Sequence, residues 1–179
     1  MSAPPEFLDS FDVEGRSVTV RTMQPQDRDI EDVFVRSLSD ESRYYRFHGA
    51  LRKLSATMLD HFTSPQYPEE MALIATIVDG DAEQQIGVVR YARTEVSNRA
   101  EVAIVVADEW QGKGIGTRMM TALRDLARDA GIQELEVNIL RENRRMLGLA
   151  RQLGYLQPLK ADGPTTVVLG KRTDPSRGD

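Results

Sequence analysis

One stretch near the middle of the chain, residues 101–116, constrains the fold more than any other. It reads EVAIVVADEWQGKGIG. Apolar residues first alternate with others, as in a buried strand, and glycines then recur at every second position. A helical pattern begins directly after the last glycine. The stretch therefore predicts a strand that passes through a glycine-rich turn into the N-terminus of a helix.

Such a turn is suited to binding an anion. Glycine lets backbone N–H groups approach a phosphate closely, and the unpaired N–H groups and the dipole of a helix N-terminus favour negative charge. The spacing G-x-G-x-G lacks the last interval of the dinucleotide fingerprint, and no Lys-Ser or Lys-Thr pair closes it as in a P-loop. The pattern that fits is Q-x-x-G-x-G, from Gln111 to Gly116.

The composition excludes several chemistries. A chain of 179 residues suits one domain with a substantial core, and its net charge of −5 argues against a nucleic-acid surface. Cysteine is absent, which excludes disulfides and a cysteine nucleophile. His48 and His61 have no third ligand nearby, so no metal is expected. Neither an export signal nor a run of about 20 apolar residues occurs, so we expect a cytoplasmic protein without membrane contact.

The apolar patterns predict a lead-in over residues 1–16, a single domain over 17–171 and a disordered tail over 172–179. The first helix is expected to bury Ile30, Val33, Phe34 and Leu38. The expected order of elements is a strand from Val18, a helix after Pro25, helices capped by Ser39 and Ser55, a hairpin of Met71–Val78 and Ile86–Ala92, the Glu101 strand, a helix ending at Gly131, a strand over Leu135–Ile139, a helix from Asn143 to Gly154, and a strand over Thr165–Leu169. This order predicts an α/β domain with a mixed sheet.

The Gln111–Gly116 loop and this order of elements resemble the GNAT family of N-acetyltransferases, from about Val18 to about Leu169. The resemblance implies a mostly antiparallel central sheet with helices on both faces. It also implies that the Glu101 strand and the Leu135–Ile139 strand splay apart to admit acetyl-CoA. In this family the loop holds the pyrophosphate, and the preceding strand offers backbone groups to the pantetheine arm. The implied cofactor-binding residues are Ile104, Val105, Val106, Gln111, Gly112, Lys113, Gly114, Ile115, Gly116, Thr117 and Asn143.

Acetyl transfer to an amine requires a neutral amine and a stabilised carbonyl oxygen. A lysine amine has a pKa of about 10.4, so a base is needed. Glu101 is the candidate base, because many family members have an acidic residue at this place in the strand. The alternative is an edge glutamate paired with a nearby arginine. The family's usual oxyanion donors are backbone N–H groups of residues 104–106.

Two positions near the last helix also bear on the chemistry. Asn143 is expected to cap this helix, to contact the pantetheine arm, or both. Many relatives protonate the leaving thiolate with a tyrosine four or five residues before a Gly-Phe pair. Here the pair is Gly154-Tyr155, and Ala150 stands at the tyrosine position. Water, the substrate or Tyr155 is left for that step.

The segment SLSDESRYYRFHGALRKLSATML, with its S-R-Y-x-R-F run, resembles the Pat-type protein lysine acetyltransferases of bacteria. Those enzymes acetylate the active-site lysine of acyl-CoA synthetases. The resemblance implies an acyltransferase with acetyl-CoA as co-substrate and a protein substrate contacted around Arg43–Phe47. Ordinary helices with buried aromatics and solvated arginines explain the same run. Two other functions stay open, a small-molecule amine N-acetyltransferase and a non-catalytic acyl-CoA-binding sensor.

Overall fold

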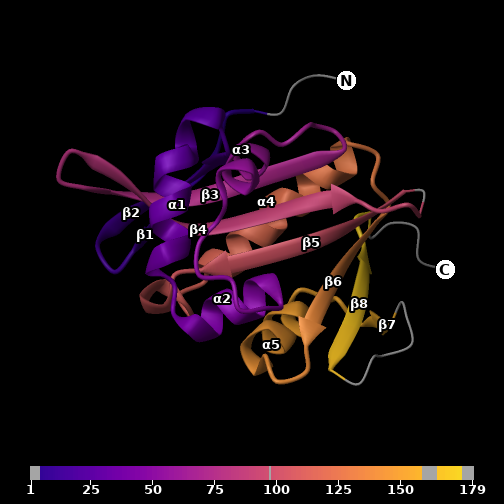
Figure 1. Ribbon diagram of the computed structural model, residues 1–179. Helices are drawn as coiled ribbons and strands as arrows, with labels where there is room; N and C mark the ends of the chain where they lie inside the picture. Colours follow the sequence, from indigo (N-terminus) through magenta and orange to yellow (C-terminus); the bar gives the residue numbers. More distant parts are fainter. Residues whose placement is uncertain (1–4, 97, 159–164, 175–179) are drawn as a thin grey trace.

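The computed structural model describes residues 5–96, 98–158 and 165–174. Within these ranges one sheet of eight strands is covered by helices on both faces (Figure 1). The strands are β1 (Phe7–Val13), β2 (Arg16–Thr22), β3 (Glu70–Asp79), β4 (Ala82–Arg93), β5 (Arg99–Val106), β6 (Glu134–Leu140), β7 (Gln157–Pro158) and β8 (Thr166–Arg172). The helices are α1 (Arg28–Ser37), α2 (Asp40–Phe47), α3 (Ala56–Thr63), α4 (Ile115–Asp129) and α5 (Arg144–Gln152), with short 3₁₀ turns η1 (Pro25–Asp27) and η2 (Asp108–Trp110).

The strand order is β1-β2-β3-β4-β5-β6-β8-β7, and every neighbouring pair is antiparallel except β5 and β6. Helix α4 connects these two parallel strands, as a crossover between parallel strands requires. The predicted α/β fold with a mixed, mostly antiparallel sheet is therefore confirmed.

Strand β3 is buried from Met71 to Ile77 because each of its faces meets a different helix layer. On β3, Leu73 and Ala75 belong to the core that contains the inner side of α4. Ile74, between them, belongs to a second core with Phe34 of α1. Figure 1 shows the same division, with α1, α2 and α3 in front of the sheet and α4 behind it. A sheet covered on both faces needs continuous apolar runs instead of strict alternation.

The N-terminal segment differs from the sequence-based expectation. Residues Phe7–Val13, predicted as part of a loosely held lead-in, form the edge strand β1 and pair with β2 from Phe7 opposite Arg21 to Val13 opposite Arg16. The first four residues of the lead-in lie outside the described residues. At the other end, β8 reaches Arg172, and the buried Thr173 donates its N–H to the Gln133 carbonyl at 3.0 Å. The domain thus extends into the predicted tail, of which residues 175–179 lie outside the described ranges.

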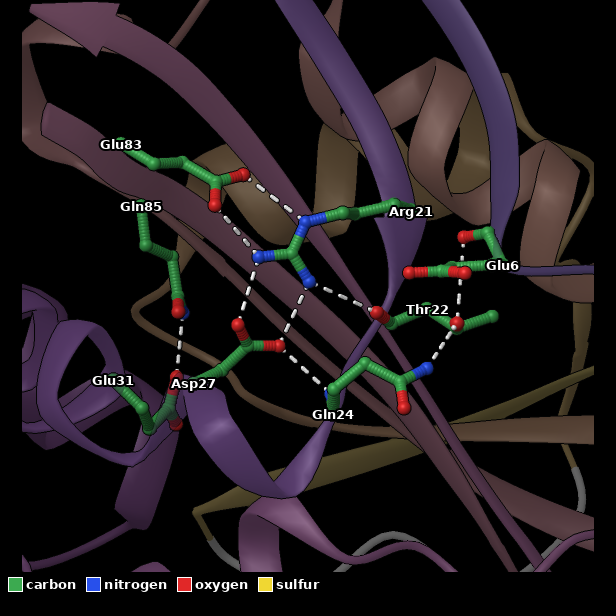
Figure 2. A network of polar contacts seen from close by, with 8 residues as sticks. All are labelled: Glu6, Arg21, Thr22, Gln24, Asp27, Glu31, Glu83 and Gln85. Carbon is green, nitrogen blue, oxygen red and sulfur yellow. Dashed lines mark hydrogen bonds and ion pairs between the residues drawn. The ribbon is translucent and has the colours of Figure 1, made fainter. Parts of the chain in front are cut away.

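The buried face of α1 also differs. Phe34 and Leu38 are buried as predicted, but Val33 is 63% exposed, and Glu31 and Val35 are buried instead. Glu31 can occupy this face because Gln85 of β4 donates a hydrogen bond to its carboxylate (Figure 2). The prediction for Val33 is wrong because a polar partner from a distant strand changes which side of the helix turns inward.

A second polar cluster fixes the start of α1 to the sheet. The Arg21 guanidinium of β2 lies between Asp27 of η1 and Glu83 of β4, with both carboxylates within 2.8–3.0 Å (Figure 2). Asp27 in turn accepts the Gln24 N–H at 2.7 Å and so caps η1. The contacts of Arg21 with Asp27 and with Glu83 are both charge-assisted. They therefore hold η1 and the helix α1 that follows it in a fixed position over β2 and β4.

Candidate active site

Strands β5 and β6 separate halfway along the sheet. Their pairing runs from Arg99 opposite Glu134 only as far as Val102 opposite Val137. Beyond that point β5 continues to Val106 along β4, while β6 continues to Leu140 along β8. Figure 1 shows the two strands diverging toward α2 and α5. The predicted splay is therefore confirmed.

A cleft of about 1230 Å³ occupies the divergence and is walled by β5, β6, α2, the glycine loop and α5. Apart from Lys113 and Ile115, all of the site residues predicted from the sequence line it. The Lys113 ammonium instead pairs with Glu14 at 2.6 Å, and the Ile115 side chain is 1% exposed in the core. The predicted residues that line the cleft are Glu101, Ile104, Val105, Val106, Gln111, Gly112, Gly114, Gly116, Thr117 and Asn143.

The C-terminal part of β5, residues 104–106, directs backbone N–H groups into the gap between β5 and β6. Just beyond the strand, the Ala107 N–H donates to the Ile86 carbonyl of β4 at 2.8 Å. Because bonded and non-bonded pairs alternate in an antiparallel ladder, the N–H groups of Ile104 and Val106 point away from β4. The Val106 carbonyl points the same way and accepts from the Gln111 side chain at 2.9 Å. The gap is thus lined by amide donors that β6 no longer reaches.

The glycines of the loop have two different physical roles. Gly112 and Gly114 have φ values of 74° and 83°, which L side chains rarely adopt, and a Cβ at either would meet no atom within 4 Å. Gly116 lies inside α4, where a Cβ would be 3.3 Å from Leu149 Cδ2 of α5. Gly114 is the N-cap of α4 and supplies no side-chain cap, so the first N–H groups of this helix are left for another acceptor.

The Gln111 side chain ties the loop to both walls of the cleft. Its amide nitrogen donates to the Val106 carbonyl at 2.9 Å and to Ser42 Oγ of α2 at 3.2 Å. Its oxygen accepts from Arg145 Nη1 of α5 at 2.6 Å. The loop therefore cannot shift without moving α2 and α5, and Gln111 is held by protein contacts on both ends of its amide.

Helix α2 is anchored to the same region by Asp108. Its carboxylate accepts from the Ser39 backbone N–H at 3.0 Å, from Ser39 Oγ at 2.7 Å and from Ser42 Oγ at 2.8 Å. Burial alone would raise the pKa of Asp108, but these hydrogen bonds outweigh it, and the pKa lies below its ordinary value. The stabilisation is therefore present above the unfolded pKa of about 3.9 and is lost as the pH falls through the lower folded value.

Ser39→Ala is expected to lower the free energy of unfolding by about 1 kcal/mol, because Ser39 Oγ caps α2 by accepting the Ser42 N–H at 3.1 Å. Ser55→Ala is the matched control, since Ser55 caps α3 through the Met58 N–H at 3.2 Å. Urea unfolding should show a loss for both variants, and a larger one for Ser39→Ala, because the Ser39 hydroxyl also donates to the Asp108 carboxylate. Only Ser39→Ala should also raise KM for an acceptor, because α3 does not line the cleft. Equal acceptor KM values in the two variants would contradict this role of α2.

Glu101 stands where β5 and β6 part. Its side chain is exposed, lines the cleft and lies on the same face of β5 as Ala103 and Val105, the face that α2 covers. Its carboxylate forms no ion pair or hydrogen bond with the described residues, and the nearby Arg46 interacts with it only through longer-range electrostatics. An edge glutamate committed to an arginine, the alternative raised by the sequence, is thus not what the structure shows. The carboxylate is available to a ligand.

Asn143 caps α5 by accepting the Met146 N–H at 3.0 Å, and it also lines the cleft. Ala150 is fully buried and Tyr155 is 2% exposed in the core, and neither lines the cleft. The tyrosine that does line it is Tyr45 of α2, whose hydroxyl is 3.3 Å from Glu41. The sequence presented Tyr44 and Tyr45 side by side, and only the placement of α2 shows which of them faces the gap.

In the ranges 5–96, 98–158 and 165–174, no three His, Cys, Asp or Glu side chains gather into a group that could hold a metal ion. In the same part of the chain no helix is both long and apolar enough to cross a bilayer.

The splayed strand pair and the glycine loop at the N-terminus of α4 are the arrangement expected of a GNAT acetyltransferase. The family model of the acetyltransferase (GNAT) domain matches residues 17–156. The chain therefore belongs to the GNAT family, and it is an acyltransferase, as the sequence analysis predicted. Proteins of this family use acetyl-CoA.

Individual relatives agree with this assignment. The chain is 30% identical over 162 residues to acetyltransferase PA5475 of Pseudomonas aeruginosa. The matched region covers 90% of this chain and 87% of that protein. It is 31% identical over 117 residues to acetyltransferase Pat of Mycolicibacterium smegmatis. The matched region covers 65% of this chain but only 34% of Pat. Among solved structures, the GNAT domain of S. lividans PAT superposes with a TM-score of 0.81 at 26% identity, covering 92% of this chain and 96% of that one.

Proposed function

We propose that this chain transfers the acetyl group of acetyl-CoA to the ε-amine of a lysine in a protein, such as an acyl-CoA synthetase. The observation that carries the chemistry is the unpaired Glu101 carboxylate, which lies in the cleft at the point where β5 and β6 separate. Support for the acceptor comes from the S-R-Y-x-R-F run of α2 and from the likeness to the S. lividans PAT domain over nearly all of that domain.

The residues of the cleft fit acetyl-CoA. The open space around Gly112 and Gly114, together with the uncapped N-terminus of α4, forms a cradle for the pyrophosphate. Amide groups of Ile104 and Val106 line the gap in which the pantetheine arm and the thioester would lie, and Asn143 faces them from α5. Lys113 and Ile115 would contribute through their backbone, because their side chains are committed elsewhere.

The chemical step then follows from the residues around the gap. The Glu101 carboxylate takes a proton from the lysine ammonium, directly or through water, so that the neutral nitrogen forms a bond to the acetyl carbon. Backbone N–H groups of β5 stabilise the negative charge on the carbonyl oxygen. After the attack the nitrogen carries a positive charge and loses a second proton. When the C–S bond breaks, this proton reaches the thiolate through water or through Tyr45, the tyrosine that lines the cleft.

A small-molecule amine acetyltransferase is the second candidate. The cleft is lined by the carboxylates of Glu41, Glu101 and Glu142, a set that suits a small cationic amine. An acyl-CoA-binding sensor without activity has less support, because a sensor does not require an unpaired carboxylate beside the gap.

The test is incubation with acetyl-CoA and a panel of acceptors, followed by mass spectrometry. The panel holds purified acyl-CoA synthetases, lysine peptides, free amino acids and polyamines, and Glu101→Gln serves as the control for spontaneous acetylation. We expect an acetylated lysine in at least one synthetase. Turnover of free amines alongside failure with every synthetase and peptide would contradict the protein-lysine acceptor. Binding of acetyl-CoA with no turnover of any acceptor would support the sensor.

A further inference from the structure

The two arginines of α2 are used very differently. Arg43 turns toward the end of α1, where it donates to the carbonyls of Arg36 and Leu38 and pairs with Asp40. Arg46, one turn further on, is half-buried and lines the cleft. It makes no hydrogen bond or ion pair with any residue that the structure describes, and its Cζ lies over the Phe47 ring, 4.8 Å from the ring centroid. Arg43 is therefore a structural residue that joins α2 to the end of α1, whereas the Arg46 guanidinium is available to a ligand in the cleft.

The charged residues around Arg46 interact with it electrostatically, but none of them accepts a hydrogen bond from its guanidinium. Burial is the main cause that lowers its pKa, neighbouring Arg90 adds to this effect, and Glu31 and Glu101 oppose it, which leaves the pKa at about 10. Arg46 therefore stays cationic at neutral pH. Arg90 of β4 is itself occupied, since it donates to the Phe62 carbonyl at 3.1 Å and stacks over the Phe62 ring. Glu31 is held from behind by Gln85 (Figure 2).

A guanidinium has five N–H donors, and withdrawing it from water is costly unless oxygens accept them. Arg46 is partly withdrawn from water, and the described protein supplies none of these oxygens. A ligand oxygen that reached the cleft would therefore gain a charge-assisted hydrogen bond, whereas a second cation there would be repelled by Arg46. Glu101 lies within the electrostatic reach of Arg46, so this preference acts close to the reacting amine.

We propose that Arg46 is an acceptor-binding residue that donates to a carbonyl or carboxylate oxygen next to the acceptor lysine, and that it disfavours polyamines. The proposal rests on the proposed function, because it assigns the acceptor side of the same cleft. The carboxylates of the cleft attract the amine, and Arg46 recognises the oxygens that a polypeptide carries and a polyamine lacks. The two features together select a lysine within a peptide.

The test compares KM and kcat for three acceptors: Nα-acetyl-lysine methylamide, which offers only carbonyls; Nα-acetyl-lysine, which adds a carboxylate; and spermidine. Arg46→Gln should raise KM for both lysine compounds by roughly tenfold, the smaller range for a charge-assisted hydrogen bond, and should lower KM for spermidine. A larger change for the carboxylate compound would identify a carboxylate as the natural partner. Arg46→Lys keeps the charge and should restore part of the loss. Arg52→Gln, on an exposed connection outside the cleft, is the control.

Acetyl-CoA affinity and the melting temperature separate binding from a structural role. Both should stay unchanged in Arg46→Gln, and a parallel loss of stability, acetyl-CoA affinity and activity on all three acceptors would overturn the proposal. Unchanged KM values for the lysine compounds would overturn it as well. If free amino acids were acetylated and protein lysines were not, the proposed function would fail. A tenfold rise of KM for those amino acids in Arg46→Gln would then still support Arg46.

Discussion

Glu101→Gln is expected to bind acetyl-CoA with unchanged affinity and to turn over more slowly by roughly 10²–10⁴-fold, the usual contribution of a general base. Glutamine keeps the size of the side chain and loses the ability to take a proton. No ion pair of the described residues is broken, because the Glu101 carboxylate has none. The measurements are kcat at saturating acceptor and calorimetric titration with acetyl-CoA. Glu109→Gln is the matched control, since Glu109 is exposed in η2 and does not line the cleft.

The pH dependence gives a second readout of the same variant. A lysine amine has a pKa of about 10.4. Below this pH, the fraction of neutral amine rises about tenfold with each unit of increase in pH. The difference between Glu101→Gln and the unmodified chain should therefore shrink as the pH approaches 10. Equal turnover of the two proteins at pH 7 would leave Glu101 without a role in proton transfer.

Gly114→Val is expected to reduce acetyl-CoA affinity on the order of 100-fold, about 2.7 kcal/mol. Valine is β-branched and cannot adopt φ 83° without strain, so the turn must rearrange or the helix N-terminus must shift. The added side chain also projects into the open space that the pyrophosphate would occupy. Calorimetry with coenzyme A measures the loss.

The control for backbone strain is Gly80→Val. Gly80 has φ 63°, lies in the turn between β3 and β4, and does not line the cleft. This variant should lose stability through the same kind of strain and keep its affinity for coenzyme A. An unchanged affinity in a folded Gly114→Val protein would remove the glycine loop from the binding site.

The features that the sequence predicted correctly are local ones. The loop from Gln111 to Gly116 follows from glycine spacing between a strand and a helix. Ser39, Ser55 and Asn143 all cap the helices they were expected to cap, because each needs only a backbone N–H three residues ahead. The apolar run over Met71–Val78 is long enough to identify a strand with both faces covered.

The features that were missed depend on partners far along the chain. The run FLDSFDV has no clean alternation and becomes a strand only because β2 offers an edge. Glu31 turns inward only because Gln85 meets it there. Arg46 had the same sequence signal as Arg43, and what separates them is the contact of Arg43 with the end of α1. Gln111 was predicted as part of the loop, but its links to Ser42 and Arg145 join three separate segments.

The central claim is that the gap between β5 and β6 brings acetyl-CoA and a lysine amine together at Glu101. A crystal structure with a bisubstrate analogue, in which the coenzyme A sulfur is joined through an acetyl linker to the ε-nitrogen of a lysine peptide, tests it most directly. We expect the pyrophosphate at the amides of residues 112–117, the linker carbonyl at a β5 amide, and the ε-nitrogen within direct or one-water reach of the Glu101 carboxylate, about 3 Å for each direct contact. An analogue bound outside the gap, or one whose nitrogen points away from Glu101, would contradict the claim.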